Sequence, residues 1–133
     1  MKITAFRPMI LTKKPEEAIA LFEALGFERR HNKKDAVENG EQGLNFSSVV
    51  MKDANGFYVD VCHADIDLLE RDMTVIRMNV DDFDEAAEML LSNGFRKSKI
   101  VGESYTPTSK YAFFVSPSGF VIDLIKHIKK EDQ

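Results

Sequence analysis

Hydrophobic positions along the chain follow two patterns, and the first has the three- and four-residue spacing of amphipathic helices. One such segment spans residues 15–26. Pro15 suits the first position of a helix, and Gly26 favours a left-handed stop. The expected apolar stripe consists of Ala18, Leu21, Phe22 and Leu25.

A second helical segment spans residues 82–94 and ends, like the first, at a glycine. Asp82 and Glu85 have the spacing of a capping box, in which side chains satisfy free backbone N–H groups at the start of a helix. The expected apolar stripe consists of Phe83, Ala86, Ala87 and Leu90. The chain is therefore predicted to contain two helices.

The second pattern consists of short segments rich in Val, Ile, Phe and Tyr, separated by turn residues, which is typical of β-strands. In the first half the expected strands cover residues 3–11, 27–31, 44–51 and 57–62. In the second half they cover residues 74–80, 95–103, 111–115 and 120–125. Each half is thus predicted to have the order strand, helix, strand, strand, strand.

The two halves correspond residue by residue, which indicates an internal repeat. Gly26 matches Gly94 at a separation of 68 residues, and Asp60 matches Asp123 at a separation of 63. The shift of five residues is one shortened loop, and the charged segment 32–43 accounts for it. We expect one domain over residues 1–133. Its two modules are predicted at about 1–66 and about 72–128.

This repeat predicts an α+β fold in which two tandem βαβββ modules form a curved mixed sheet around a groove, with the helices on the outer face. Alternation along the last strand of each module separates the two faces. The residues expected on the helix side are Phe57, Val59, Val61, Phe120, Ile122 and Leu124. The opposite face carries Asp60 and Asp123, so it is expected to line the groove.

The chain resembles the vicinal oxygen chelate superfamily, which includes glyoxalases, bleomycin resistance proteins and extradiol dioxygenases. The resemblance rests on the duplicated plan and on two segments, residues 15–27 and 116–124. The second is similar to the strand motif of the family, Asp-Pro-x-Gly-x-x-Ile-Glu. The resemblance covers nearly the whole chain.

The resemblance implies where a divalent metal ion would lie in members that use one. Such members hold the ion with a side chain early in the first strand of each module and a carboxylate late in the last strand. The carboxylate positions are Asp60 and Asp123, whereas the early positions fall near Arg7 and Val75. Arginine keeps its proton and valine has no donor atom, so no metal and no cofactor are expected.

Two arginines, Arg7 and Arg77, are predicted to face the groove together with Asp60 and Asp123. The arginines can clamp a carboxylate or phosphate of a ligand, or they can neutralise the two aspartates in a structural network. The aspartates, in turn, can lie at the floor of the groove, contacting a cationic ligand or acting as a general base, or they can be solvated on an open sheet face. The sequence leaves these alternatives open.

Aromatic side chains are expected to form the walls of the groove, since rings give large contact areas at little cost in rotamer entropy. The candidates are Tyr58, Tyr105, Tyr111, Phe113 and Phe46, of which Tyr58 and Tyr111 are the most suitable. The polar segment 103–109 is predicted to be a hairpin loop that covers the mouth. His127 lies in a basic tail and is expected at a solvated surface.

Composition and charge exclude several classes of function. The 133 residues carry a net charge of −4 with both signs interspersed, which disfavours nucleic acid as a partner. The single cysteine, Cys62, cannot form an internal disulfide, which is compatible with a reducing compartment. Without a long apolar run, no membrane partner is expected, and we predict a cytoplasmic protein.

These observations favour a metal-independent small-molecule binding protein that holds its ligand in the sheet groove. The predicted ligand contacts are Arg7, Tyr58, Asp60, Arg77, Tyr111, Phe113 and Asp123. The alternative is a metal-dependent lyase, isomerase or dioxygenase that uses Asp60 and Asp123 with a non-standard ligand set. A third class is an interaction module without a ligand. A homodimer is expected, since pairing protects an exposed sheet edge or groove face.

Overall fold

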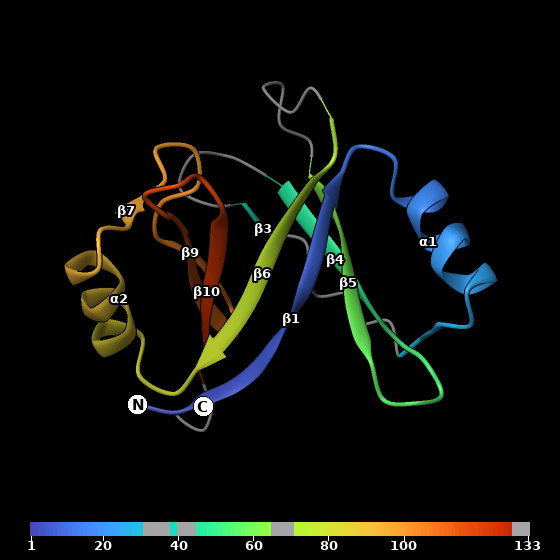
Figure 1. Cartoon of the computed structure of the whole chain (residues 1–133), viewed down its shortest axis with the longest axis horizontal. Helices are drawn as coiled ribbons and strands as arrows, with labels where there is room; N and C mark the ends of the chain where they lie inside the picture. Colours follow the sequence, from blue (N-terminus) through green and yellow to red (C-terminus); the bar gives the residue numbers. More distant parts are fainter. Residues whose placement is uncertain (31–37, 40–44, 65–70, 129–133) are drawn as a thin grey trace.

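The computed structural model describes residues 1–30, 38–39, 45–64 and 71–128, and within them it contains two helices and one ten-stranded mixed sheet (Figure 1). The first half contains β1 Ile3–Thr12, α1 Pro15–Ala24, β2 Glu28–Arg29, β3 Glu38–Asn39, β4 Asn45–Lys52 and β5 Tyr58–Ala64. The second half contains β6 Met73–Val80, α2 Phe83–Ser92, β7 Arg96–Lys97, β8 Ser104–Thr106, β9 Ser109–Val115 and β10 Val121–His127. The predicted α+β fold of two βαβββ modules is confirmed.

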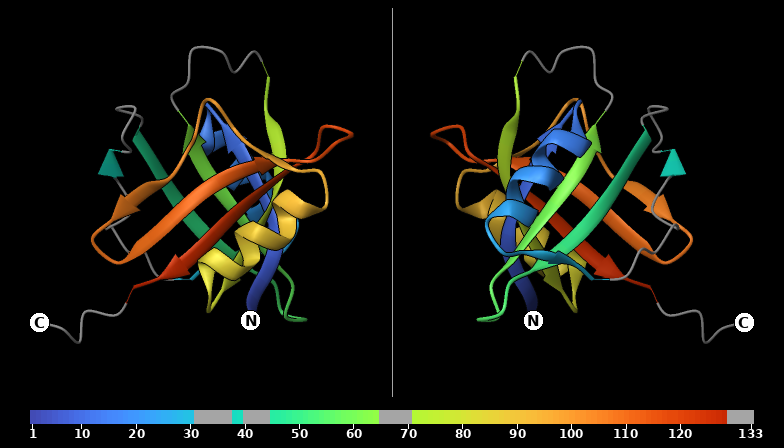
Figure 2. Two further views of the ribbon diagram at one scale, coloured as in Figure 1. Left: turned by 90° about the vertical axis from the view of Figure 1, so that its left-hand side faces the viewer. Right: turned by 90° about the vertical axis from the view of Figure 1, so that its right-hand side faces the viewer.

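The strands follow the order β2-β4-β5-β1-β6-β10-β9-β7, with β3 paired to β4 and β8 paired to β9. The first strand of each half pairs in parallel with the last strand of the same half, β1 with β5 and β6 with β10. The two halves join where β1 and β6 run antiparallel. The sheet curls into a half-barrel, with α1 and α2 at opposite ends of its outer face (Figures 1 and 2).

The internal repeat is visible in the register of this central pairing. Pro8 lies opposite Ile76, and these two residues are separated by the same 68 positions that relate the two predicted helices. Such a register is expected when an approximate twofold axis relates the two halves. The symmetry brings the groove faces of both halves to one concave surface.

Helix α1 packs on the outer face of β4 and β5 through Ile19, which is 2% exposed and contacts a cluster that includes Met51, Val59 and Val61. The predicted stripe is partly wrong. Ala18 and Phe22 pack against this cluster, but Leu21 and Leu25 are exposed. The helix is rotated so that Ile19, one position from Ala18, points to the sheet.

Helix α2 packs on the outer face of β6, β9 and β10 as predicted. Phe83 and Ala86 are buried against a cluster that includes Phe114 and Leu124, with Ala87 and Leu90 partly buried beside them. The Oδ1 atom of Asp82 accepts a hydrogen bond of 3.0 Å from the backbone N–H of Glu85, as expected for an N-cap residue.

Two predicted core residues are exposed instead. Phe57 and Phe120 end the turns before β5 and β10, where the alternation of strand side chains has not yet begun. The strand predicted at 95–103 also shortens to Arg96–Lys97. The predicted loop at 32–43, except for β3, and nearly all of the predicted module break at 66–72 lie outside the described residues.

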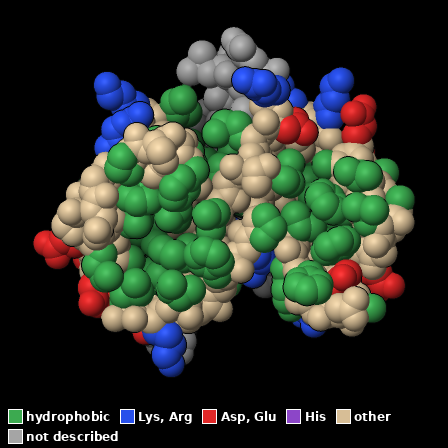
Figure 3. Space-filling view, in the orientation of Figure 1, with side chains coloured by type: hydrophobic (Ala, Val, Ile, Leu, Met, Phe, Trp, Pro, Cys, Tyr) green, Lys and Arg blue, Asp and Glu red, His purple; other side chains and the backbone are tan. Residues whose placement is uncertain are grey.

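The outer face of the sheet between the two helices carries hydrophobic side chains at its surface (Figure 3). On β1, Phe6 is 62% exposed and Pro8 is also exposed. On β6, Ile76 is partly buried beside Pro8. None of the helices in the described part of the chain has the length and apolar character needed to span a membrane.

Candidate functional site

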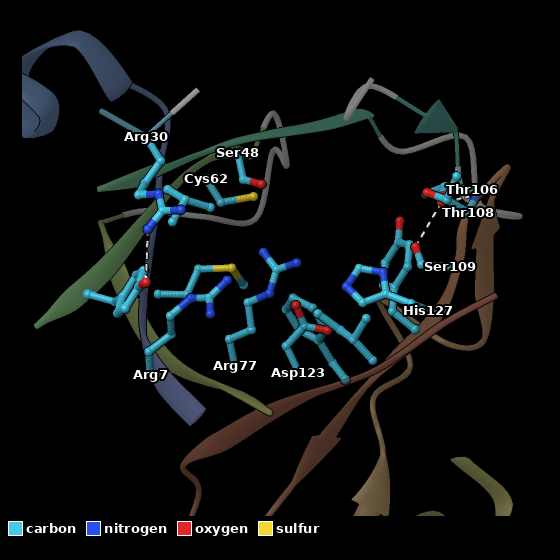
Figure 4. Close-up of a pocket in the computed structure, with 16 residues that line it drawn as sticks. Arg7, Arg30, Ser48, Cys62, Arg77, Thr106, Thr108, Ser109, Asp123 and His127 are labelled. Atoms are coloured by element: carbon cyan, nitrogen blue, oxygen red, sulfur yellow. Dashed lines mark hydrogen bonds between the residues drawn. The ribbon is translucent and has the colours of Figure 1, made fainter. Parts of the chain in front are cut away.

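The concave face of the sheet encloses a cavity of about 520 Å³ that side chains from both halves line (Figure 4). Its size falls in the range of roughly 300–1,000 Å³ that is usual for small-molecule sites. The lining comes from β1, β4, β5, β6, β9 and β10, and from the β8–β9 hairpin. The groove predicted from strand alternation is therefore present as a cavity.

Arg7 and Arg77 lie opposite each other on β1 and β6, and both bind the same carboxylate. The Nε atom of Arg7 lies 2.7 Å from Oδ1 of Asp60, and an Nη atom of Arg77 lies 2.7 Å from Oδ2. Asp60 is fully buried, while both guanidinium groups line the cavity. The two arginines thus cover Asp60, which does not itself line the cavity.

Asp123 lies beside Arg77 in the pairing of β10 with β6 and lines the cavity. It is 5% exposed, and its Oδ1 atom has no hydrogen-bond partner among the described residues. Burial raises the pKa of its carboxyl to about 7, the Arg77 guanidinium opposes this rise, and the negative charge of Asp60 adds to it. The two matching aspartates therefore have different environments, one paired twice and one unpaired.

The network predicted between two arginines and two aspartates is thus observed for only one of the aspartates. In the described part of the chain, Arg7 and Arg77 both form ion pairs with Asp60, and neither lies within ion-pair distance of Asp123. The Nε atom of Arg77 is buried and also has no partner there. Polar atoms at this end of the cavity are left incompletely satisfied, which is costly in a buried site.

Tyr58 forms one wall of the cavity with cations around its ring. Its hydroxyl accepts a hydrogen bond of 3.0 Å from Arg30, and the guanidinium carbon of Arg7 lies 5.4 Å from the ring centroid. Tyr111 and Phe113 on β9 are buried and line the opposite side. Of the aromatic residues predicted as walls, Tyr58, Tyr111 and Phe113 line the cavity. Tyr105 is exposed and does not line it, and the side chain of Phe46 lies outside the described residues.

Three hydroxyl-bearing residues of the β8–β9 hairpin line the mouth of the cavity, namely Thr106, Thr108 and Ser109. The Thr106 and Ser109 hydroxyls lie 2.7 Å apart (Figure 4). The hairpin predicted from the polar segment 103–109 is thus observed, and it contributes to the cavity rim.

Cys62 lines the cavity from β5 and is 5% exposed. Burial raises the pKa of its thiol to about 12, and the Asp123 carboxyl adds to this rise. The thiol is therefore protonated at neutral pH, and a protonated thiol is a weak nucleophile and a poor metal ligand. Its role in the cavity is limited to packing.

Some residues contribute to the cavity although the sequence did not single them out for it, among them His127 and Arg30. His127 is exposed, as predicted, yet it also lines the cavity, and its Nε2 atom lies 3.2 Å from Nδ2 of Asn79. Strand β10 runs on to His127, so the alternation that places Asp123 toward the cavity includes it. Arg30, just after the short strand β2, gave no comparable signal.

The residues at the four positions implied for a metal ion do not fit a divalent cation. Both carboxylate oxygens of Asp60 are engaged by guanidinium groups, and Arg7 and Val75 supply no lone pair. Two fixed positive charges beside the carboxylate would also repel a cation. Among the described residues, no group of three or more His, Cys, Asp or Glu side chains is placed to hold a metal ion.

Comparisons with known proteins match this chain in structure but not in sequence. No protein-family model and no curated protein matches the sequence. Methylmalonyl-CoA epimerase from Mycobacterium tuberculosis is similar in structure, with a TM-score of 0.67 and 17% identity over 96% of this chain and 91% of that chain. Streptomyces coelicolor methylmalonyl-CoA epimerase is also similar, with a TM-score of 0.59 and 17% identity over 94% of this chain and 98% of that chain.

A third similar structure is a glyoxalase/bleomycin resistance protein/dioxygenase superfamily member from Vibrio splendidus. Its TM-score is 0.52, with 14% identity over 94% of this chain and 99% of that chain. At such low identity these likenesses establish a shared fold and no activity. The chain has the vicinal oxygen chelate fold, which confirms the resemblance predicted from the sequence at the level of fold.

Proposed function

We propose that this protein binds a small molecule in the cavity without a metal ion. The observation that carries the proposal is the double ion pair of Asp60 with Arg7 and Arg77, each at 2.7 Å. In a metal-dependent protein of this fold, the same carboxylate would have to be free for the ion. Here it serves to position two guanidinium groups at the floor of the cavity.

The cavity has the features of a ligand site. Its volume of about 520 Å³ suits a small organic molecule, and it combines aromatic walls with a few convergent polar groups. Tyr111 and Phe113 provide apolar contact area, while Arg77 and Asp123 provide polar contacts at one end. We propose the seven residues predicted from the sequence as the site, with Asp60 acting through the two arginines.

Metal analysis and ligand binding test this proposal. Protein purified without chelators should contain far less than one zinc, nickel, iron or manganese ion per chain. A calorimetric screen of aromatic anions and cations should find binders whose affinity is unchanged by EDTA. Stoichiometric metal that is lost in Asp60→Ala and Asp123→Ala would favour the metal-dependent lyase, isomerase or dioxygenase instead.

A pair of hairpin variants localises the binding. Thr108 lines the cavity, whereas its exposed neighbour Pro107 does not. Thr108→Trp should therefore obstruct the mouth and weaken any binder by about tenfold or more, and Pro107→Trp should leave its affinity unchanged. Equal effects of the two variants, or a folded protein that binds no compound, would count against capture in this cavity.

We also propose that two copies of the chain pair into a homodimer, as expected from the sequence. The outer face of β1 and β6 supports this, since it is apolar and partly exposed. Two copies can bury the same patch in a symmetric contact. Cytoplasmic location and the absence of a nucleic-acid partner stay predictions.

A further inference from the structure

We propose that the ligand of the cavity is an organic anion, with its acid group beside the arginines and its apolar part against the β9 and β10 side. This inference rests on the proposed small-molecule binding and adds the chemical class of the ligand. It is carried by the balance of charges that line the cavity, by the hydrogen-bond donors left over in the arginines, and by an unpaired buried acid.

The charged side chains at the cavity are predominantly cationic. Arg7, Arg30 and Arg77 line it, and the acids beside them are Asp60 and Asp123. Asp60 neutralises one positive charge, and Asp123 is a buried carboxyl whose pKa near 7 leaves it largely uncharged below that pH. The remaining charge is positive, and in a concave site with partly buried cations it favours an anion.

The guanidinium groups also keep donors for a ligand. A guanidinium has five N–H donors in a planar fork. Among the described residues, Arg7 donates to Asp60 through Nε, and Arg77 donates to the same carboxylate through one Nη atom. Arg30 donates to the Tyr58 hydroxyl through one Nη atom. The other N–H groups of these three side chains match the bidentate binding of a carboxylate, phosphate or sulfonate.

Asp123 provides an independent indication of a bound polar group. Its side chain is buried, lines the cavity and has an oxygen without a partner, although buried polar atoms are normally satisfied. When protonated it can donate a hydrogen bond to an oxygen of the ligand, beside the guanidinium of Arg77. When ionised it repels an anion at the same place.

The apolar part of the ligand has its own surface. Tyr111, Phe113 and Ile125 line the cavity on β9 and β10, and Met9 and Val50 line it on β1 and β4. Rings and aliphatic side chains on both sides suit a flat or elongated apolar body. In Figure 4 the guanidinium groups of Arg7 and Arg77 and the Asp123 side chain lie together at the floor.

Three isosteric probes test the charge preference by calorimetry in the full chain: 2-naphthoate, 2-naphthylmethanol and 2-naphthylmethylammonium. The dissociation constant of naphthoate should be at least about tenfold lower than that of the alcohol, and the ammonium should bind most weakly. Alcohol or ammonium binding as tight as naphthoate would overturn the anion proposal while leaving small-molecule capture intact. Binding of none of the three by folded protein would overturn both.

Two neighbouring arginines supply a matched pair of variants. Arg30 lines the cavity, whereas Arg29 lies within 4 Å of Glu16 and Glu23 of helix α1, away from the cavity. Arg30→Gln and Arg29→Gln each remove one positive charge. A long-range effect of net charge on naphthoate affinity would therefore be the same for both variants. Arg30→Gln should weaken naphthoate about fivefold without affecting the alcohol, and Arg29→Gln should change neither. Equal effects would contradict a direct contact.

A pH series tests the role of Asp123. The groups that face it are Arg77 on β6, Asp60 and Cys62 on β5, Tyr111 on β9, Arg7 on β1 and His127 on its own strand. Naphthoate affinity should fall between pH 6 and 8, as Asp123 ionises. The comparison is with Asp123→Asn, which removes this carboxyl and keeps every other group that faces it, so the fall should be smaller. An unchanged pH profile would remove Asp123 from the site.

Discussion

Asp60 determines the electrostatics of the cavity at the scale of single residues. It is fully buried, and the side chains of Arg7 and Arg77 that bind it are only 18% and 15% exposed. An ionised carboxylate in such a place is stable only because both of its oxygens are paired with opposite charge. Conversely, two neighbouring guanidinium groups tolerate each other only because the carboxylate lies between them.

Neutralising this carboxylate should destabilise the fold. Asp60→Asn would leave two largely buried guanidinium groups without their counterion, and breaking a buried pair in this way costs roughly 3–5 kcal/mol. The free energy of unfolding, measured by denaturant titration, should fall by an amount of this order. Asp84→Asn is the control, because Asp84 is 89% exposed in its pair with Lys110 and should change the value by less than about 0.5 kcal/mol. Similar values for both variants would contradict the role of Asp60.

The sequence predicted which of these residues share a face but not how they pair. Alternation along the strands placed Arg7, Arg77, Asp60 and Asp123 toward the groove. In the structure Arg7, Arg77 and Asp123 line the cavity, and Asp60 is buried beneath the two arginines. It could not predict that Arg77 pairs with Asp60 two strands away, while Asp123 on the adjacent strand stays unpaired. That choice depends on side-chain conformation across the register of the strands, which a one-dimensional pattern does not contain.

The glycine turns that follow the two helices occupy equivalent positions in the repeat but have different neighbours. Gly26 and Gly94 follow α1 and α2 with φ of +107° and +93°, a backbone conformation that favours glycine. A Cβ at Gly26 would meet no atom within 4 Å, whereas a Cβ at Gly94 would lie 2.9 Å from Cγ of Pro117. Of these two glycines, only Gly94 would place a Cβ against another part of the described chain.

This difference predicts unequal costs for the same substitution. Gly26→Ala should cost about 1–2 kcal/mol, since an alanine is strained at positive φ. Gly94→Ala should cost more, because the backbone strain is the same and the new methyl group also collides with the Pro117 ring. Thermal or denaturant unfolding of the two variants measures the difference. Equal losses would show that the turn after α2 moves away from Pro117 at little cost.

Long, strongly patterned elements were predicted more accurately than short ones. The two helices and the strands β1, β4, β5, β6, β9 and β10 were predicted with small errors at their ends. The prediction failed where tertiary contacts determine the length of a strand or the rotation of a helix. Strand β7 is only two residues long, and α1 turns Ile19 rather than Leu21 to the sheet. His127 was missed because β10 continues beyond the predicted end of the strand.

At the scale of the whole molecule, the half-barrel carries the charged groups of the cavity among apolar side chains on its inner face, and its outer face is apolar between the helices. The inner face encloses the cavity, and the helices cover only the two ends of the outer face (Figures 1 and 3). Between them, the side chains that β1 and β6 turn outward carry no charge: Phe6, Pro8, Ile10, Thr74, Ile76 and Met78. Uncharged surfaces of this kind typically mark contacts between proteins.

A second copy of the chain is the partner that such a face suits, because it presents the same uncharged patch and leaves no buried charge without a counterion. A stable contact would bury on the order of 800 Å² on each copy. Sedimentation equilibrium should therefore give the mass of a dimer at micromolar concentration. Phe6→Asp should weaken the dimer at least tenfold, since it would bury a carboxylate at the contact.

Tyr105→Asp provides the control for this prediction. Tyr105 is 48% exposed on β8, whose hairpin borders the cavity mouth and not the face between the helices. It should leave the dimer intact, although it also adds a negative charge in place of an exposed aromatic ring. A monomeric wild-type chain, or equal weakening by both variants, would contradict pairing through β1 and β6. Because the cavity opens on the opposite side of the sheet, monomeric Phe6→Asp should keep its affinity for small molecules.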